Sequence, residues 1–285
     1  MSDVKEYQNY IFDLYGTLID LSTDEYRPSL WSLMAKAYNV YGCKWTGTKL
    51  KDIFFAMDEE EREITGRAVS TKYPEIRLEK VFARLLLETD ECHKVSLTVG
   101  GCPIDELRVK YSDERDEVLK IVSTSEWCVF MANLFRIHSR SYLRLYKNTL
   151  STFERLKAAG KKLFLLSNAQ KIFTYPELEA IGLLPYLDAV YISSDYDMKK
   201  PEKRFMEILI DREGLNRDES VMVGNEVGSD GAIAAACGMD SIILNTAHED
   251  MRAIKTQIKQ LLKISGVSAS YKPLIVISGD ISEII

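Results

Sequence analysis

Short apolar runs that end in polar residues recur in two separate parts of the chain. The first covers residues 10–12 and ends at Asp13, and similar runs resume after residue 146. Stretches with helical spacing separate the later runs. This alternation of strands and helices predicts a parallel sheet covered by helices on both faces. The later predicted strands cover residues 163–166, 189–192, 220–223, 241–244 and, as a possible sixth strand, 274–277.

The intervening segment, residues 21–145, follows a different pattern. Apolar residues between Leu30 and Tyr38 recur every three or four positions, which predicts a helix with one buried face. Residues 89–113 show little periodicity, so we expect an irregular loop there. The helical spacing predicts further helices at 50–63, 78–87 and from about 116 to 146.

At 285 residues the chain exceeds the length that a single hydrophobic core usually supports. We therefore expect two parts. Residues 1–20 and 146–285 form a doubly wound, Rossmann-like α/β core with a parallel sheet. Residues 21–145 form an α-helical cap domain that is inserted after the first strand.

Composition narrows the classes of function. Lys and Arg number 37 against 43 Asp and Glu, which gives a net charge of −6, and apolar residues make up 46%. This composition excludes a disordered chain and disfavours nucleic acid or an anionic membrane surface as a partner. The five cysteines form no CxxC pair, and no apolar run reaches the ~18 residues of a membrane span. With no secretion signal at the N-terminus, we expect a cytoplasmic protein.

Polar side chains follow four of the predicted strands. Because the carboxyl ends of parallel strands meet at one edge of a sheet, these side chains should lie close together. Each group by itself is typical of an ordinary turn or cap. Their joint occurrence, each after an apolar strand, favours a functional site. The groups are Asp13 and Thr17; Ser167 and Asn168; Lys199 and Lys200; and Asn225, Glu226 and Asp230.

The chemistry of these residue types is coherent. An aspartate can attack phosphorus or an activated carbon and form a covalent intermediate. Neighbouring carboxylates raise one another's pKa unless a cation neutralises their charge. Mg²⁺ held by carboxylates and water can be that cation. A lysine also compensates the charge, and hydroxyl groups donate hydrogen bonds to the transferring group.

Four short motifs resemble those of the haloacid dehalogenase superfamily, in the same order. The first motif is Phe-Asp-Leu-Tyr-Gly-Thr-Leu at 12–18, and the second is Leu-Leu-Ser-Asn at 165–168. The third is Lys200-Pro201, and the fourth runs from Val223 through Asp230 to residue 232. The inserted segment is similar in position and helical character to the C1-type cap of this superfamily.

The resemblance implies a role for each matching residue. It makes Asp13 the nucleophile, Thr17 the hydroxyl that orients it, and Ser167 a group that binds the transferring group. Lys200 is the implied stabilising cation, with Lys199 as the alternative. The implied ligands of Mg²⁺ are Asp13, the backbone carbonyl of Tyr15, Asn225, Glu226 and Asp230.

One departure from the phosphatase pattern lies at Tyr15. Phosphatases of the superfamily usually carry an aspartate there as general acid and base, whereas the 2-haloacid dehalogenase branch carries a tyrosine. A phenol with a pKa of about 10 can donate to a leaving group but is a poor base for activating water. Tyr15 is therefore either a catalytic acid or an aromatic wall of the site.

A second departure lies in the fourth motif and points the other way. Asn225 stands where phosphatases commonly carry a metal-binding aspartate, but Glu226 and Asp230 keep a carboxylate pair four residues apart. This favours a retained Mg²⁺ site. The dehalogenase branch works without metal and carries Ser-Asn-x-x-Asp at this place, which the spacing from Asn225 to Asp230 does not match. Met206 also replaces a tyrosine of that branch.

The cap offers a candidate for substrate binding. Arg136, Arg140 and Arg144 are spaced by four, which places them on one face of the predicted helix. Arg136 and Arg140, together with Asn168 of the core, are our candidates for contact with an anionic substrate. For the arginines, however, we favour the alternative of a basic face in contact with solvent.

The sequence as a whole predicts a hydrolase similar to the haloacid dehalogenase superfamily, with Mg²⁺ as cofactor and a small phosphate monoester as its anionic substrate. One alternative is a metal-independent 2-haloacid dehalogenase, with Arg62 or Arg67 near the halide. The other is a weak or inactive anion-binding protein. The oligomeric state stays open.

Overall fold

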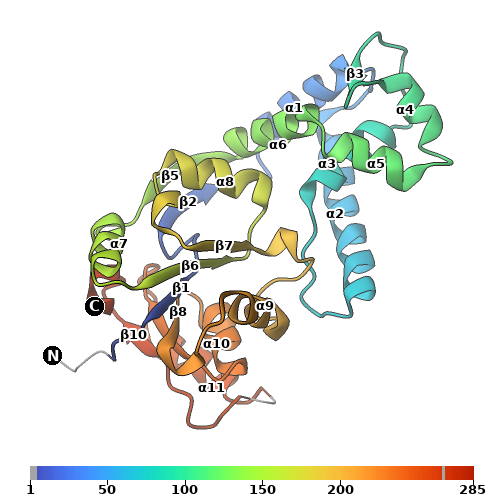
Figure 1. Ribbon diagram of the computed structural model, residues 1–285. Coiled ribbons are helices and arrows are strands. Elements are labelled where there is room, and N and C mark those ends of the chain that lie inside the picture. The colour runs from blue at the N-terminus through green and yellow to red at the C-terminus, as the bar shows by residue number, and fades with distance from the viewer. Residues whose placement is uncertain (1–4, 265–266) are drawn as a thin grey trace.

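A six-stranded parallel sheet forms the centre of the computed structural model, which describes residues 5–264 and 267–285 (Figure 1). The strand order is β10-β9-β8-β1-β6-β7, so the first strand lies between strands from the second half of the chain. The predicted α/β fold with a parallel sheet is thus confirmed. The strands are β1 (Asn9–Phe12), β6 (Lys162–Ser167), β7 (Ala189–Ile192), β8 (Ser220–Gly224), β9 (Asp240–Leu244) and β10 (Leu274–Val276).

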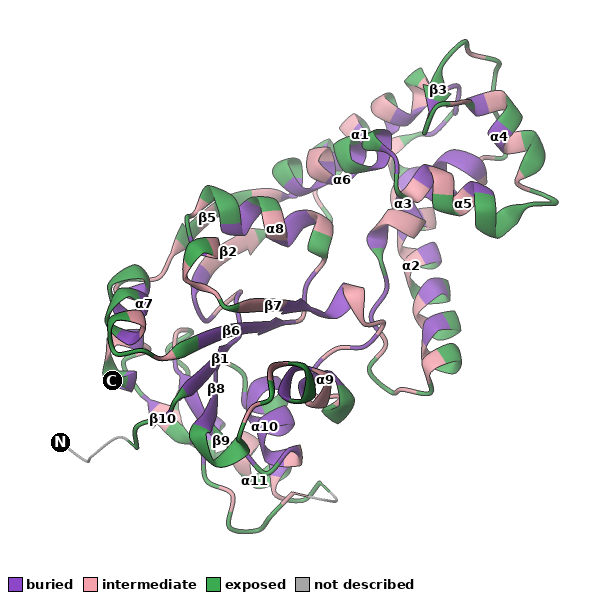
Figure 2. Cartoon of the chain, viewed as in Figure 1, coloured by how far each residue is buried: buried purple, intermediate pink, exposed green. Residues whose placement is uncertain are grey.

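Helices cover both faces of this sheet, which explains why its strands are continuous apolar runs. In β1, Tyr10 and Phe12 pack on one side with Phe153 of α7, whereas Ile11 packs on the other side with Phe205 of α9. Figure 2 shows the central strands as buried along their length. The core helices are α7 (Thr149–Ala158), α8 (Lys171–Ala180), α9 (Lys203–Glu213), α10 (Ala232–Ala236) and α11 (Met251–Leu261).

Short helical turns complete the core and lie close to the strand ends. Those turns are Leu184–Tyr186, Ser193–Asp195, Arg217–Glu219, Val227–Gly231 and Ile281–Ile284.

Six helices of the inserted segment project away from the sheet (Figure 1). They have a hydrophobic cluster of their own, and aromatic rings of Trp31, Phe54, Phe82 and Phe135 pack against one another in it. Phe173 of α8 is also buried in this cluster, so the segment rests on one core helix. The helices are α1 (Pro28–Val40), α2 (Gly47–Val69), α3 (Leu78–Leu87), α4 (Ile104–Lys110), α5 (Arg115–Ser123) and α6 (Glu126–Ser139).

A two-stranded antiparallel ribbon connects the two parts, and it corrects one of our predictions. The helical stretch expected from about 116 to 146 is confirmed up to Ser139 and wrong beyond it, because the chain forms α5, then α6, and then the strand β5 (Arg140–Leu145). β5 pairs with β2 (Ile19–Thr23), so the segment that leaves the core lies beside the segment that returns to it. The four-residue spacing of the arginines suggested that the helix continues, whereas residues 140–145 form a strand through their pairing with β2.

The irregular loop expected over residues 89–113 is also wrong in part. This stretch contains the antiparallel pair β3 (Thr98–Val99) and β4 (Cys102–Pro103), and it contains α4 as well. The described part of residues 21–145 is therefore mostly, but not entirely, helical. Within residues 5–264 and 267–285, no single helix has both the length and the apolar composition of a membrane span; only α5 and α6, bent by 61° to each other, reach them together.

Candidate functional site

Asp13 lies at the carboxyl end of β1, in the middle of the sheet edge. Its backbone N–H donates to the carbonyl of Val223, which extends the pairing of β1 with β8 by one residue. The loop that follows turns sharply at Gly16, where φ is +84° and a side chain would meet the amide of Asn225. Glycine thus lets the loop after β1 lie against the loop after β8, and Asp13 is left only 7% exposed.

Three side chains donate hydrogen bonds to the carboxylate of Asp13. Lys200 Nζ lies 2.6 Å from Oδ1, and Ser167 Oγ, at the end of β6, lies 3.3 Å from the same oxygen. Thr17 Oγ1 lies 3.0 Å from Oδ2. The residues that were predicted from four distant motifs are therefore brought together. Of the two neighbouring lysines, Lys200 reaches Asp13, whereas the Lys199 N–H donates to the carbonyl of Tyr73.

Asp230 completes this cluster from the other side of the lysine. Its Oδ1 accepts from Lys200 Nζ at 2.7 Å, and its Oδ2 accepts from the backbone N–H groups of Asn225 and Glu226 at 3.0 Å each. One carboxylate thus fixes both the lysine and the loop after β8. Two carboxylates face one ammonium group, and this leaves an excess of negative charge.

Burial controls the protonation of this cluster. It raises the pKa of Asp230 to about 6; repulsion from Asp13 adds to this effect and the charge of Lys200 opposes it. Burial alone would lower the pKa of Lys200, but attraction to both carboxylates outweighs it and raises that pKa above the ordinary value. Lys200 is therefore a firmly charged ammonium group at neutral pH.

Asn168 braces the loop that carries Lys200. Its side-chain Nδ2 donates to the carbonyl of Lys200 at 3.1 Å, and its Oδ1 accepts from the N–H of the same residue at 2.7 Å. The amide also lines a cavity of about 230 Å³ beside Asp13. Contact of Asn168 with a substrate stays a prediction, since both ends of its amide already hold the lysine loop.

The same cavity offers oxygen ligands, which suit a hard cation such as Mg²⁺. Asp13, Asp230 and Glu226 contribute carboxylates, Asn225 an amide oxygen, and Tyr15 lies at its wall. Glu226 is exposed and already lines the cavity. Over the described ranges no three His, Cys, Asp or Glu side chains are already arranged as a metal site. The donor set fits Mg²⁺ provided that amide, carbonyl and water oxygens complete the coordination.

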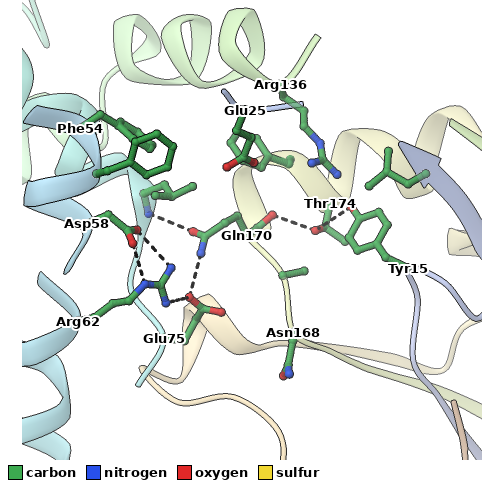
Figure 3. A pocket seen from close by; sticks show the side chains of 15 residues that line it. Tyr15, Glu25, Phe54, Asp58, Arg62, Glu75, Arg136, Asn168, Gln170 and Thr174 are labelled. Carbon is green, nitrogen blue, oxygen red and sulfur yellow. Dashed lines mark hydrogen bonds and ion pairs between the residues drawn. The ribbon is translucent and has the colours of Figure 1, made fainter. Parts of the chain in front are cut away.

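The phenol of Tyr15 points toward Thr174 of α8, at the junction with the inserted segment (Figure 3). It donates to Glu177 Oε2 at 2.5 Å and lies 3.3 Å from Thr174 Oγ1, both on α8. Burial, with repulsion from Glu177 as the next cause, raises the pKa of Tyr15 far above that of a free phenol. Tyr15 is therefore a neutral hydrogen-bond donor that already has an acceptor.

Glu177 also forms ion pairs with both arginines that were considered for substrate binding. Arg136 Nε and Nη2 donate to its two oxygens at 2.8 and 3.1 Å, and Arg140 Nη1 donates at 2.8 Å. The guanidinium of Arg136 lies 5.3 Å from the ring centre of Tyr15. A face in contact with solvent is thus excluded for Arg136, which is buried.

The expectation that three arginines share one helix face is wrong. Arg136 belongs to α6, Arg140 begins β5, and Arg144 pairs with Asp20 on the exposed ribbon. Sequence reasoning also missed Glu177, because it lies in an ordinary helix outside every motif. A single buried carboxylate carries no local signal that would have revealed its role.

A second cavity, of about 300 Å³, lies where the inserted segment meets the core. Tyr15 and Asn168 line both cavities, so the two spaces adjoin. Figure 3 shows Arg62 between Asp58 and Glu75 on its wall, at 2.8 and 3.0 Å. The remaining lining residues include the aromatic side chains of Phe54, Phe55 and Phe173, the carboxylate of Glu25, and Arg136, Gln170 and Thr174.

Comparison with known proteins gives consistent matches. A family model described as haloacid dehalogenase-like hydrolase matches residues 78–244. The glyceraldehyde 3-phosphate phosphatase of Methanothermobacter thermautotrophicus is 28% identical over 200 residues, which cover 69% of this chain and 86% of that protein. A protein of the same name from Methanocaldococcus jannaschii is 34% identical over 110 residues, which cover 38% and 48% of the two chains.

A solved structure of similar fold is that of a putative haloacid dehalogenase-like hydrolase from Bacteroides fragilis. It is aligned over 98% of this chain and 100% of that chain, with a TM-score of 0.51 and 16% identity. The likeness extends over the inserted segment as well as the sheet.

Proposed function

Because the chain belongs to the haloacid dehalogenase-like hydrolases, we propose that it is a phosphatase in which Asp13 attacks small phosphate monoesters and Mg²⁺ assists. The observation that carries the proposal is the hydrogen bonding of Asp13. An ammonium group and two hydroxyl groups hold its carboxylate at the edge of a cavity, in a fixed orientation. A nucleophile held in this way loses little freedom when it attacks.

In the first step, an Asp13 oxygen forms a bond to phosphorus, the bond from phosphorus to the ester oxygen breaks, and that oxygen takes a proton from water as the alcohol leaves. Lys200 and Ser167 then lie where they can donate to the oxygens of the transferring group. In the second step, water attacks the aspartyl phosphate and releases inorganic phosphate, which restores Asp13. Mg²⁺, held by Asp13, Asp230 and their neighbouring oxygens, would neutralise the charge of the phosphoryl group.

The neighbouring cavity is suited to the rest of the substrate. It adjoins the Asp13 cavity at Tyr15 and Asn168 and has room for a small leaving group. The two curated relatives named above act, by name, on a three-carbon phosphate ester. We therefore propose a substrate of similar size, with its phosphate at Asp13 and its remainder under the inserted helices.

A 2-haloacid dehalogenase has weaker support. Tyr15 at the second place after Asp13 is the feature that favours it. However, Arg62 is engaged by Asp58 and Glu75, and Arg67 is exposed and pairs with Glu63. Neither arginine that was considered for the halide contacts Asp13.

Phosphate release from a panel of small monoesters, with Mg²⁺ and with EDTA, tests the proposal. Asp13→Asn should lower kcat by at least about a thousandfold, because the nucleophile is lost. Asp211→Asn, an exposed site on α9, is the matched control and should leave the rate unchanged. Turnover that survives EDTA would contradict the role of the metal, and turnover that survives Asp13→Asn would contradict the nucleophile. Halide release in place of phosphate release would favour the dehalogenase.

A further inference from the structure

Two cysteines of the inserted segment face each other across an isolated antiparallel bridge. Cys43 lies in the turn between α1 and α2, and Cys92 lies in the loop after α3. The N–H of His93 donates to the carbonyl of Gly42 at 2.8 Å, so the hydrogen bond lies beside the cysteines and not between them. In such a pair the Cα atoms lie about 4.5 Å apart with both side chains on the same face, and disulfides span this distance.

Gly42 permits this close approach. Its φ is +87°, and a side chain at this position would run into the backbone carbonyl of His93. The glycine before Cys43 therefore brings the turn directly against the loop of Cys92. The contact depends on backbone atoms and on a residue without Cβ, and this fixes the register of the two cysteines.

The two sulfur atoms have different surroundings. Cys92 is exposed, whereas Cys43 is buried and its Sγ accepts from Arg108 Nη2 at 3.3 Å. Burial raises the pKa of Cys43 to about 11, and the charge of Arg108 opposes this effect. A small oxidant thus reaches Cys92 first, and Arg108 lies where it stabilises the Cys43 thiolate in a later step.

We propose that Cys43 and Cys92 form a reversible disulfide when the protein meets a low-molecular-weight disulfide such as oxidised glutathione. The Cys92 thiolate attacks the oxidant, breaks its S–S bond, and releases one glutathione thiolate. The Cys43 thiolate then attacks Cys92 Sγ and releases the second. The two protein thiols are oxidised, one molecule of oxidant is reduced, and their two protons pass to solvent and the leaving thiolates.

This cross-link joins the turn before α2 to the loop after α3. It closes a loop of the chain that includes both helices, so it restricts the unfolded segment and stabilises the folded one. Neither cysteine lines the cavity at Asp13 or the adjoining cavity. The disulfide should therefore alter the thermal stability of the inserted segment and leave hydrolysis of small esters unchanged.

Oxidation of the fully reduced protein with oxidised glutathione tests the proposal. We expect the intact mass to fall by about 2 Da, peptide mapping to link Cys43 to Cys92, and the Tm to rise by about 5 °C until dithiothreitol reverses the change. Cys43→Ser and Cys92→Ser should each abolish the rise. Cys102→Ser, the control, should retain it.

Three results would overturn the proposal. The first is a link that joins Cys92 to a cysteine other than Cys43. The second is a glutathione adduct that stays on Cys92 without resolving. The third is a mapped Cys43–Cys92 link that leaves the Tm unchanged or lowers it.

Discussion

Two polar clusters, the first buried and the second mostly buried, meet at Tyr15, and their net charges have opposite signs. The edge cluster, Asp13, Lys200 and Asp230, places two carboxylates on one ammonium group. The junction cluster, Glu177, Arg136 and Arg140, places two guanidinium groups on one carboxylate. The backbone of Tyr15 belongs to the loop of the first cluster, and its phenol belongs to the second.

This difference in charge suggests different roles: the edge cluster serves catalysis, and the junction cluster stabilises the structure. The edge cluster is open to a cavity, and its excess negative charge suits a divalent cation. The junction cluster joins three segments, α6, α8 and the β2–β5 ribbon, and its charges are largely used in holding them together. We expect substitutions in the first cluster to abolish activity, and those in the second to reduce stability with a smaller effect on the rate.

The largest effect is expected at Lys200. Lys200→Ala leaves Asp13 and Asp230 buried without a cation, so the free energy of unfolding should fall by about 3 to 5 kcal/mol and phosphate release should be lost. Urea denaturation and the phosphate assay measure both. Lys199→Ala is the matched control and should change neither. Equal effects of the two variants would contradict the assignment of Lys200 to the edge cluster.

A smaller loss is expected at Glu177. Glu177→Gln leaves Arg136 buried without its ion pair, which should lower the free energy of unfolding by about 2 kcal/mol at pH 7. Burial alone would raise the pKa of Glu177, but hydrogen bonds and charge from Arg136, together with Tyr15 and Arg140, lower it below 4.5.

The sign of that pKa shift gives a pH test of the same variant. A lowered carboxylate pKa stabilises the protein above about pH 4.5, the ordinary value, and this contribution is lost as the pH falls through the folded-state value. The difference between wild type and Glu177→Gln should therefore shrink in acid. A difference that grows below pH 4.5 would contradict the ion-pair role.

Tyr15→Phe tests whether the Tyr15 hydroxyl group stabilises the structure or acts as a catalytic acid. Removal of the hydroxyl group leaves Glu177 with one donor fewer, which should lower the free energy of unfolding by about 1 kcal/mol. The pH profile of kcat should keep its shape and its maximum should change by less than about threefold, because the phenol already donates to Glu177. A profile that loses its alkaline limb would show that Tyr15 donates a proton during turnover.

The smallest effect is expected on the exposed ribbon. Arg144→Ala removes an ion pair with Asp20 that faces solvent, so thermal unfolding and phosphate release should stay within measurement error. Arg140→Ala, four residues earlier, should lower the Tm because Arg140 contacts Glu177. Equal effects of the two variants would mean that the junction cluster extends further than its hydrogen bonds indicate.

The sequence by itself predicted the parallel sheet and the residues at its carboxyl edge. Asp13, Ser167 and Lys200 follow apolar runs, and such runs are local signals that stay readable without tertiary contacts. Once the strands are parallel, their ends must meet, so the cluster follows from topology. The resemblance to the superfamily motifs, which occur in the same order along the chain, then implied a role for each of these residues.

Only the tertiary structure decided which residues the Tyr15 phenol and Glu177 contact. It also decided which elements carry the three arginines and that Cys43 lies opposite Cys92. Each depends on contacts between segments far apart in the chain, which no periodicity records. Arg136 lies in a helix and Arg140 lies in a strand although they are four residues apart, because the pairing of β5 with β2 outweighs helix propensity at Arg140. Local pattern determines which elements form, whereas packing between them determines where each polar side chain finds its partner.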